Sequence, residues 1–135
     1  YKSAAILNSI FSEFNNDTKY SESENQKILP SILYIKENMF RKDFSLTEAA
    51  KKSMMSDTYF RKLFNKEFNM SPKKYVITKR MEYASSLIMS KYYSLQEIAD
   101  MCGYADYKHF SVEFKKHFLI SPSHYYYPPD RPKKE

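Results

Sequence analysis

Glycine is almost absent from this sequence: Gly103 is the only glycine among 135 residues. The dipeptides that close tight β-hairpins, Asn-Gly and Asp-Gly, do not occur, which argues against a sheet-rich fold. Cysteine also occurs once, at Cys102, so an internal disulfide and a cysteine-rich zinc site are both excluded. No apolar run approaches the ~20 residues of a membrane span. We therefore expect an all-α protein of one domain or two very small ones, located in the cytoplasm, and we predict no membrane among its partners.

Motifs for enzyme chemistry are missing as well. There is no Gly-rich phosphate loop, no pair of catalytic carboxylates and no Ser/His/Asp arrangement, so we predict a protein that is not an enzyme and uses no cofactor. His109, His117 and His124 have no Asp, Cys or Glu at ligand spacing beside them, which favours a surface or phosphate-contacting role over a metal site. Cys102 is interpreted as a buried packing residue rather than a nucleophile.

Positive charge is plentiful and unevenly distributed. The net charge is +6 and the isoelectric point about 9.2, which favours an acidic partner such as nucleic acid or an anionic membrane. Residues 45–127 carry 13 Lys and Arg against 8 Asp and Glu, whereas residues 1–27 carry 3 against 4. The positive charge therefore lies in the same part of the chain as an internal repeat.

The repeat is visible in two short stretches, FNMSPKKY at 68–75 and FLISPSHY at 118–125. SLTEAAKKSMM at 45–55 likewise matches SLQEIADMCGY at 94–104 with an offset of 49 residues, and the offset becomes 50 after Ala105. The chain that follows residue 44 thus consists of two copies of one unit.

Each copy has the pattern of a helix-turn-helix. A capping box, Ser45 to Glu48 or Ser94 to Glu97, predicts the start of a short helix. A break at 53–55 or 102–104 follows, and a second helix then carries phenylalanines at i, i+4 and i+8, which predicts one buried stripe. These phenylalanines are Phe60, Phe64 and Phe68 in the first copy and Phe110, Phe114 and Phe118 in the second.

The face of each second helix that points away from the phenylalanines is basic and polar. In the first copy this face holds Thr58, Arg61, Lys62 and Asn65. In the second copy it holds Lys108, Ser111, Val112 and Lys115. A basic face is often only a solvated surface, but on the second helix of a helix-turn-helix it predicts contact with DNA bases. Candidates for phosphate contact, as side chains or as amide groups at helix starts, are Thr47, Lys66, Lys73, Lys74, Gln96 and Lys116.

An amphipathic helix over residues 73–90 is expected between the copies, started by Ser71 and Pro72. At about 1.5 Å per residue it would span roughly 27 Å, which invites comparison with the ~34 Å repeat of duplex DNA. We expect 28–92 to form the first subdomain with this linker helix and 93–127 the second. Residues 1–27 would be the end of an upstream domain or a linker, with a partial N-terminal helix, and 128–135 a disordered tail.

Residues 30–127 resemble the DNA-binding domain of the AraC/XylS family of bacterial transcription regulators. The resemblance rests on ILYIKENMF, SLTEAA, MSDTYFRKLFNKEF, SPKKY, KRMEYASSLI, SLQEIADMCGY, ADYKHFSVEFKKHF and SPSHY. It implies about seven helices and binding of double-stranded promoter DNA by a cytoplasmic, nucleoid-associated regulator, with both second helices in successive major grooves. It also implies a further domain for effector sensing or dimerisation, and RNA polymerase is another candidate partner of such an activator.

Carried over to this sequence, the base-reading positions of the family are Thr58, Arg61 and Lys62 in the first copy and Tyr107, Lys108 and Val112 in the second. The sequence departs from the family at Val112, where Arg is common, and at Asn69 and Leu119, where Gly is common. Leu does not readily adopt the left-handed conformation of a helix end, so we expect the second copy to end differently and to read DNA with less discrimination.

The alternative is a helical protein-interaction module in which the repeats only pack against each other. Such arrays need about three repeats, and a period of 49–50 residues is long for the common ones. The concentration of positive charge within the repeat favours DNA binding.

Overall fold

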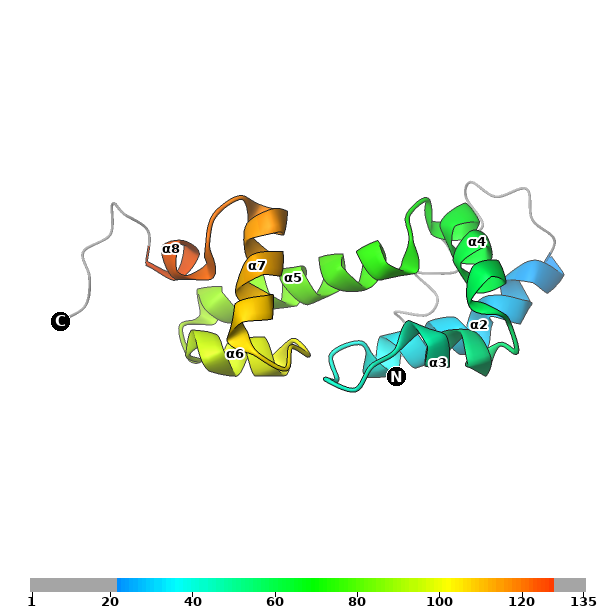
Figure 1. Cartoon of the computed structure of the whole chain (residues 1–135), viewed down its shortest axis with the longest axis horizontal. Coiled ribbons are helices and arrows are strands. Elements are labelled where there is room, and N and C mark those ends of the chain that lie inside the picture. The colour runs from blue at the N-terminus through cyan, green and yellow to red at the C-terminus, as the bar shows by residue number, and fades with distance from the viewer. Residues whose placement is uncertain (1–21, 128–135) are drawn as a thin grey trace. The chain divides into compact units, whose positions relative to one another are not determined.

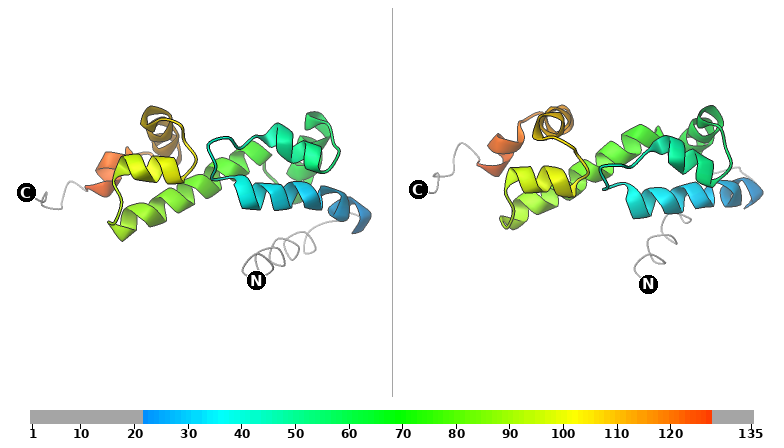
Figure 2. Two further views of the ribbon diagram at one scale, coloured as in Figure 1. Left: turned by 90° about the horizontal axis from the view of Figure 1, so that it is seen from below. Right: turned by 60° about the horizontal axis from the view of Figure 1, so that its bottom comes forward.

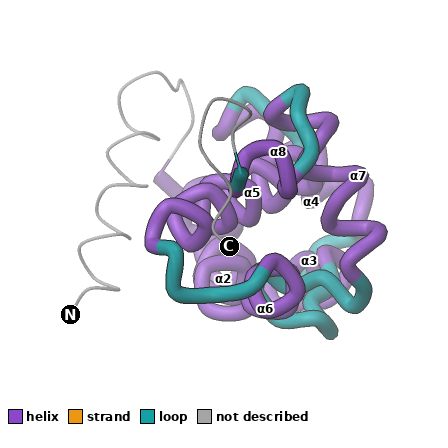
Figure 3. The backbone as a smooth tube through the Cα atoms, turned by 90° about the vertical axis from the view of Figure 1, so that its left-hand side faces the viewer, coloured by secondary structure: helices purple, strands orange, loops and turns teal. Residues whose placement is uncertain are grey.

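The capping residues and apolar stripes of the two copies form helices close to the predicted places. The structure is a computed structural model that describes residues 22–127, and in this part of the chain it contains seven helices and no strand (Figure 1, Figure 3). The helices are α2 (Glu22–Asn38), α3 (Leu46–Lys52), α4 (Asp57–Phe68), α5 (Pro72–Ser90), α6 (Leu95–Met101), α7 (Tyr107–Phe118) and α8 (Pro122–Tyr126). The predicted all-α class is confirmed. The expected helix at the N-terminus and the tail at 128–135 lie outside the described residues.

Helix α2 begins at Glu22, inside the segment that the polar composition assigned to a linker. Ile28, Ile32 and Ile35 of this helix are buried, so its apolar side is part of the core. Burial of that side stabilises the whole helix, including the polar turns that precede it, which composition alone does not indicate.

The described chain forms two compact units. The first contains residues 22–38 and 45–75, and the second contains residues 39–44 and 76–127. Helix α5 thus contributes its first turn to one unit and the rest of its length to the other. The expected boundary at residue 92 followed the repeat, whereas the compact units follow packing, and the segment 39–44 belongs to the second unit although it connects two helices of the first.

The first unit is built around the phenylalanine stripe of α4. Phe60 and Phe64 are buried together with Ala49 and Ala50 of α3, whose small side chains allow the helices to approach closely. The further views in Figure 2 show α2, α3 and α4 grouped together. Phe60 and Phe64 are confirmed as core residues, whereas Phe68 at the end of the stripe is half-buried.

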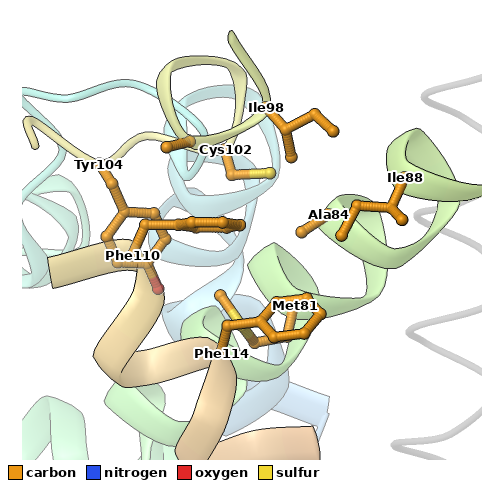
Figure 4. Packing of buried hydrophobic residues seen from close by; sticks show 9 residues of the cluster. Met81, Ala84, Ile88, Ile98, Cys102, Tyr104, Phe110 and Phe114 are labelled. Carbon is orange, nitrogen blue, oxygen red and sulfur yellow. The ribbon is translucent and has the colours of Figure 1, made fainter. Parts of the chain in front are cut away.

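The core of the second unit repeats this arrangement with other residues. Met81, Ala84 and Ile88 of α5 face Phe110 and Phe114 of α7 (Figure 4). The remaining buried members of this cluster are Ile98, Ala99, Cys102 and Tyr104. Burial raises the pKa of the Cys102 thiol to about 12, despite the opposing effect of the nearby Arg80 charge. The interpretation of Cys102 as a buried packing residue is confirmed, and its thiol stays protonated at neutral pH.

The two predicted capping boxes differ in the structure. The Ser94 side chain accepts a hydrogen bond from the Glu97 amide, and Glu97 accepts one from the Ser94 amide in return, so this box is complete. Ser45 accepts from the Glu48 amide, but the Glu48 carboxylate lies 3.5 Å from the Lys51 ammonium. The first box is therefore only half formed, because Lys51 on the next turn attracts the Glu48 side chain.

The expectation that the second copy ends differently is wrong. Helix α4 ends at Asn69 with φ 61° and ψ 25°, and α7 ends at Leu119 with φ 68° and ψ 5°. In each case the amide of the last residue donates to the carbonyl four residues earlier at 2.8 Å. The left-handed conformation is required by the turn into the next helix, which restarts at a Ser-Pro pair in both copies, and this requirement outweighs the preference of Leu.

Candidate nucleic-acid interface

Helix α4 presents a continuous polar face on the side opposite its buried phenylalanines. Ser56 caps the helix by accepting a hydrogen bond from the Tyr59 amide at 3.1 Å, which fixes where the face begins. All four residues predicted to read bases are exposed, namely Thr58, Arg61, Lys62 and Asn65. Within residues 22–127, no carboxylate forms an ion pair with Arg61 or Lys62. Their donors are therefore available to an external acceptor.

The matching face of α7 is less uniform. Lys108 and Lys115 are exposed, and Val112 is 46% exposed, whereas Tyr107 and Ser111 are half-buried. The Tyr107 ring lies 5.9 Å from the Phe110 ring, and burial raises the pKa of Tyr107. Tyr107 thus has a packing role as well as a position on the predicted reading face.

The residues predicted to contact phosphate all lie at exposed positions. These are Thr47, Lys66, Lys73, Lys74, Gln96 and Lys116. The Thr47 hydroxyl donates to an Asp57 carboxylate oxygen at 3.3 Å, so this side chain links the first turns of α3 and α4. At the start of α5, Ser71 accepts a hydrogen bond from the Lys74 amide at 3.1 Å. Lys73 and Lys74 therefore lie in a capped first turn.

The histidines are placed differently from what the sequence suggested in one respect. Glu113 lies beside His109, with 3.9 Å between the imidazole and the carboxylate, so a potential ligand is present at i+4. Across residues 22–127, no group of three His, Cys, Asp or Glu side chains is arranged to hold a metal ion. The same part of the chain has no helix long and apolar enough to cross a membrane.

Sequence reasoning missed the residues that support the turn of each helix-turn-helix. In the first unit, the Ser31 hydroxyl bonds to the Ser53 hydroxyl and to the Ala49 carbonyl. In the second unit, Arg80 bonds to backbone carbonyls of the segment 39–44. The one signal in the sequence was Gly103, the only glycine, which adopts φ 95° beside this segment.

Comparison with known proteins matches residues 49–126 to the model of a helix-turn-helix domain family. The chain belongs to the AraC-type helix-turn-helix family. It is 34% identical over 101 residues to the lactose operon transcription activator of Staphylococcus xylosus, covering 75% of this chain and 36% of that protein. The chain therefore spans little more than a third of that relative.

Two solved structures have a similar fold. The C-terminal domain of the two-component response regulator yesN from Fusobacterium nucleatum has a TM-score of 0.69 and 30% identity, with 76% of this chain and 98% of that chain covered. The DNA-binding domain of AdpA, solved in complex with a target DNA, has a TM-score of 0.67, and the match covers 74% of this chain and 89% of that chain. Because its sequence identity is 23%, this match shows a shared fold only. The expected function of this domain, sequence-specific DNA binding in a transcription regulator, is confirmed by the family and its relatives, which are regulators and not enzymes.

Proposed function

We propose that this AraC-type domain recognises an asymmetric duplex DNA site with two unequal heads, which are the exposed faces of α4 and α7. The α4 head reads bases, and the α7 head mainly adds affinity. The observation that carries the proposal is the exposed face of α4, where Arg61 and Lys62 have no ion pair within residues 22–127. Arg61 offers a bidentate pair to guanine and Lys62 donates to the same edge, each worth about 1–3 kcal/mol of discrimination. Asn65 and Thr58 extend the face by one turn in each direction.

The second head has fewer groups that distinguish one base from another. Lys108 and Lys115 bind phosphates as readily as bases, and Val112 has only a thymine methyl as a readable partner. Tyr107 and Ser111 are half-buried and contribute a smaller contact area. Two heads of unequal sequence on one chain predict a site of about two helical turns that is not a palindrome, with the two helices in successive major grooves.

Phosphate contacts supply the part of the affinity that does not depend on sequence. Lys66, Lys73, Lys74 and Lys116 are exposed near the ends of α4, α5 and α7. Each contact that releases a counterion adds about −0.9 to the slope of log affinity against log salt. To test the proposal, bound duplexes are selected from a random pool, and the affinity for the selected duplex is measured at several salt concentrations. Affinity that does not change with salt would refute these phosphate contacts.

Two substitutions separate the roles of the heads. Arg61→Ala is expected to relax the base preference in one half-site by about 1–3 kcal/mol. Lys115→Ala is expected to weaken binding about equally for all sequences, because it removes a phosphate contact. Competition between the selected site and its single-base variants measures both effects. A larger loss of discrimination from Lys115→Ala than from Arg61→Ala would show that the heads are assigned in the wrong order.

The longer relatives suggest what lies around this domain. We propose that the domain acts in a cytoplasmic, nucleoid-associated regulator, beside a further domain for effector binding or dimerisation. RNA polymerase is the proposed partner if the whole protein activates transcription. A reporter gene placed downstream of the selected site, with and without that further domain, tests the regulatory role separately from DNA binding.

A further inference from the structure

Arg80 holds a segment of the chain that is distant in sequence. Its Nε atom donates to the Met39 carbonyl at 2.7 Å, and its Nη2 atom donates to the Arg41 carbonyl at 3.3 Å. Its guanidinium also lies 5.9 Å from the centre of the Phe44 ring. One side chain of α5 thus fixes both ends of the segment 39–44 within the second unit.

The fixed segment presses against the turn of the second helix-turn-helix. Gly103 has φ 95°, and a Cβ atom placed there would lie 3.0 Å from the Phe40 carbonyl group and 3.0 Å from Arg80 Nη2. Glycine is therefore required both by its backbone conformation and by the close approach of the segment. Lys42 pairs with Asp100 at 2.9 Å and ties the same segment to α6.

The turn at Gly103 supports the start of α7. The Tyr104 side chain is buried, and its ring lies 5.1 Å from the His109 ring and 5.6 Å from the Phe110 ring. The Arg80 guanidinium lies 5.2 Å from the centre of the Tyr104 ring. A continuous set of contacts therefore runs from Arg80 through Tyr104 to the first turn of α7, which carries Lys108.

The first unit supports its turn in another way at the equivalent position. Ser31 and Arg80 are 49 residues apart, the same offset that relates α3 to α6. Ser31 bonds to Ser53, which aligns with Cys102, and to Ala49, and needs no additional segment. The two copies thus use different chemistry for the same task, and this difference makes a matched experiment available.

We propose that Arg80 is a positioning residue for the second head: by fixing the segment 39–44 against Gly103 and Tyr104, it sets the orientation of α7 on DNA without contacting DNA. The proposal rests on the proposed function, since it assumes that α7 contributes to binding. It distinguishes Arg80 from the exposed cations of α4 and α7, which act by direct contact.

The test measures what the second head adds to affinity. The full selected duplex is compared with the same duplex cut short after the half-site whose base preference depends on Arg61, and the ratio of the two affinities is determined. Arg80→Gln and Arg80→Lys are both expected to lower this ratio about two- to tenfold, the factor for one net hydrogen bond, because neither side chain can bond both carbonyls in the same way. Ser31→Ala is the matched control, and it should leave the ratio unchanged while it weakens binding to the short duplex.

Salt dependence separates positioning from direct contact. A positioning role leaves the slope of log affinity against log salt unchanged in Arg80→Gln. A slope reduced by about 0.9, together with recovery in Arg80→Lys, would show a phosphate contact and overturn the proposal. An unchanged affinity ratio in Arg80→Lys would also overturn the positioning role. If Arg80→Gln does not fold, the affinity ratio of Arg80→Lys alone tests the proposal. Equal binding of the two duplexes by the unsubstituted chain would refute the proposed role of the second head instead.

Discussion

Replacement of Leu119 by Asn is expected to stabilise the protein. Leu119 ends α7 with φ 68°, in the left-handed region that costs a residue with a Cβ roughly 1–2 kcal/mol. The side chain is 81% exposed, so only about a fifth of its burial energy, roughly 0.3–0.6 kcal/mol, is lost on replacement. Asn tolerates this conformation better, and the first copy already has Asn69 at the equivalent position with φ 61°. The net gain should be about 0.5–1 kcal/mol.

Thermal unfolding followed by circular dichroism measures this gain. For a chain of 135 residues, 1 kcal/mol corresponds to about 4 °C in Tm. The neighbouring change Ile120→Asn is the control, because Ile120 is also exposed but does not have a positive φ. The reverse swap, Asn69→Leu, should destabilise by a similar amount.

The outcome that refutes the reasoning is an equal effect of Leu119→Asn and Ile120→Asn. Such a result would mean that removing an exposed apolar side chain, and not relieving the backbone, changes the stability. A destabilising Leu119→Asn would show that the exposed Leu119 side chain contributes more than its small buried fraction indicates.

Two further predictions concern the turns and pH. Gly103→Ala is expected to destabilise the protein by more than about 1 kcal/mol, because φ is 95° and the new Cβ would lie 3.0 Å from the Phe40 backbone. Met54 occupies the equivalent turn position with φ 58° and is 96% exposed, so Met54→Gly should be neutral or stabilising in the same thermal assay. Stability against urea should fall as pH rises above about 9, because unfolded Cys102 ionises near its ordinary value of 9.0 while the folded thiol, with a pKa of about 12, stays protonated. Cys102→Ala should flatten this dependence between about pH 9 and 10, below the range in which Tyr104, whose pKa burial raises from 10.0 to about 12, also contributes, and an unchanged slope there would contradict burial of Cys102 as its cause.

The sequence by itself determined the helices of the two copies, their core stripes and the resemblance to a family. The phenylalanine spacing in α4 and α7 and the caps at Ser45 and Ser94 are local signals that involve residues within one or two turns. Signals of this kind can be recognised in the sequence, because they depend only on residues that are close together in the chain. The exposed polar face of α4 followed from the same periodicity, because the side of a surface helix opposite its buried stripe faces solvent.

Only the tertiary structure decided how each unit is completed. Arg80 and Met39 are 41 residues apart, and nothing in the local pattern shows that the segment 39–44 packs in the second unit. The conformation of Leu119 likewise depends on the turn that must lead into α8, and that requirement outweighs a local preference of roughly 1–2 kcal/mol. Periodicity specifies which side of a helix is buried, but the path of the chain in space determines which distant residue covers it.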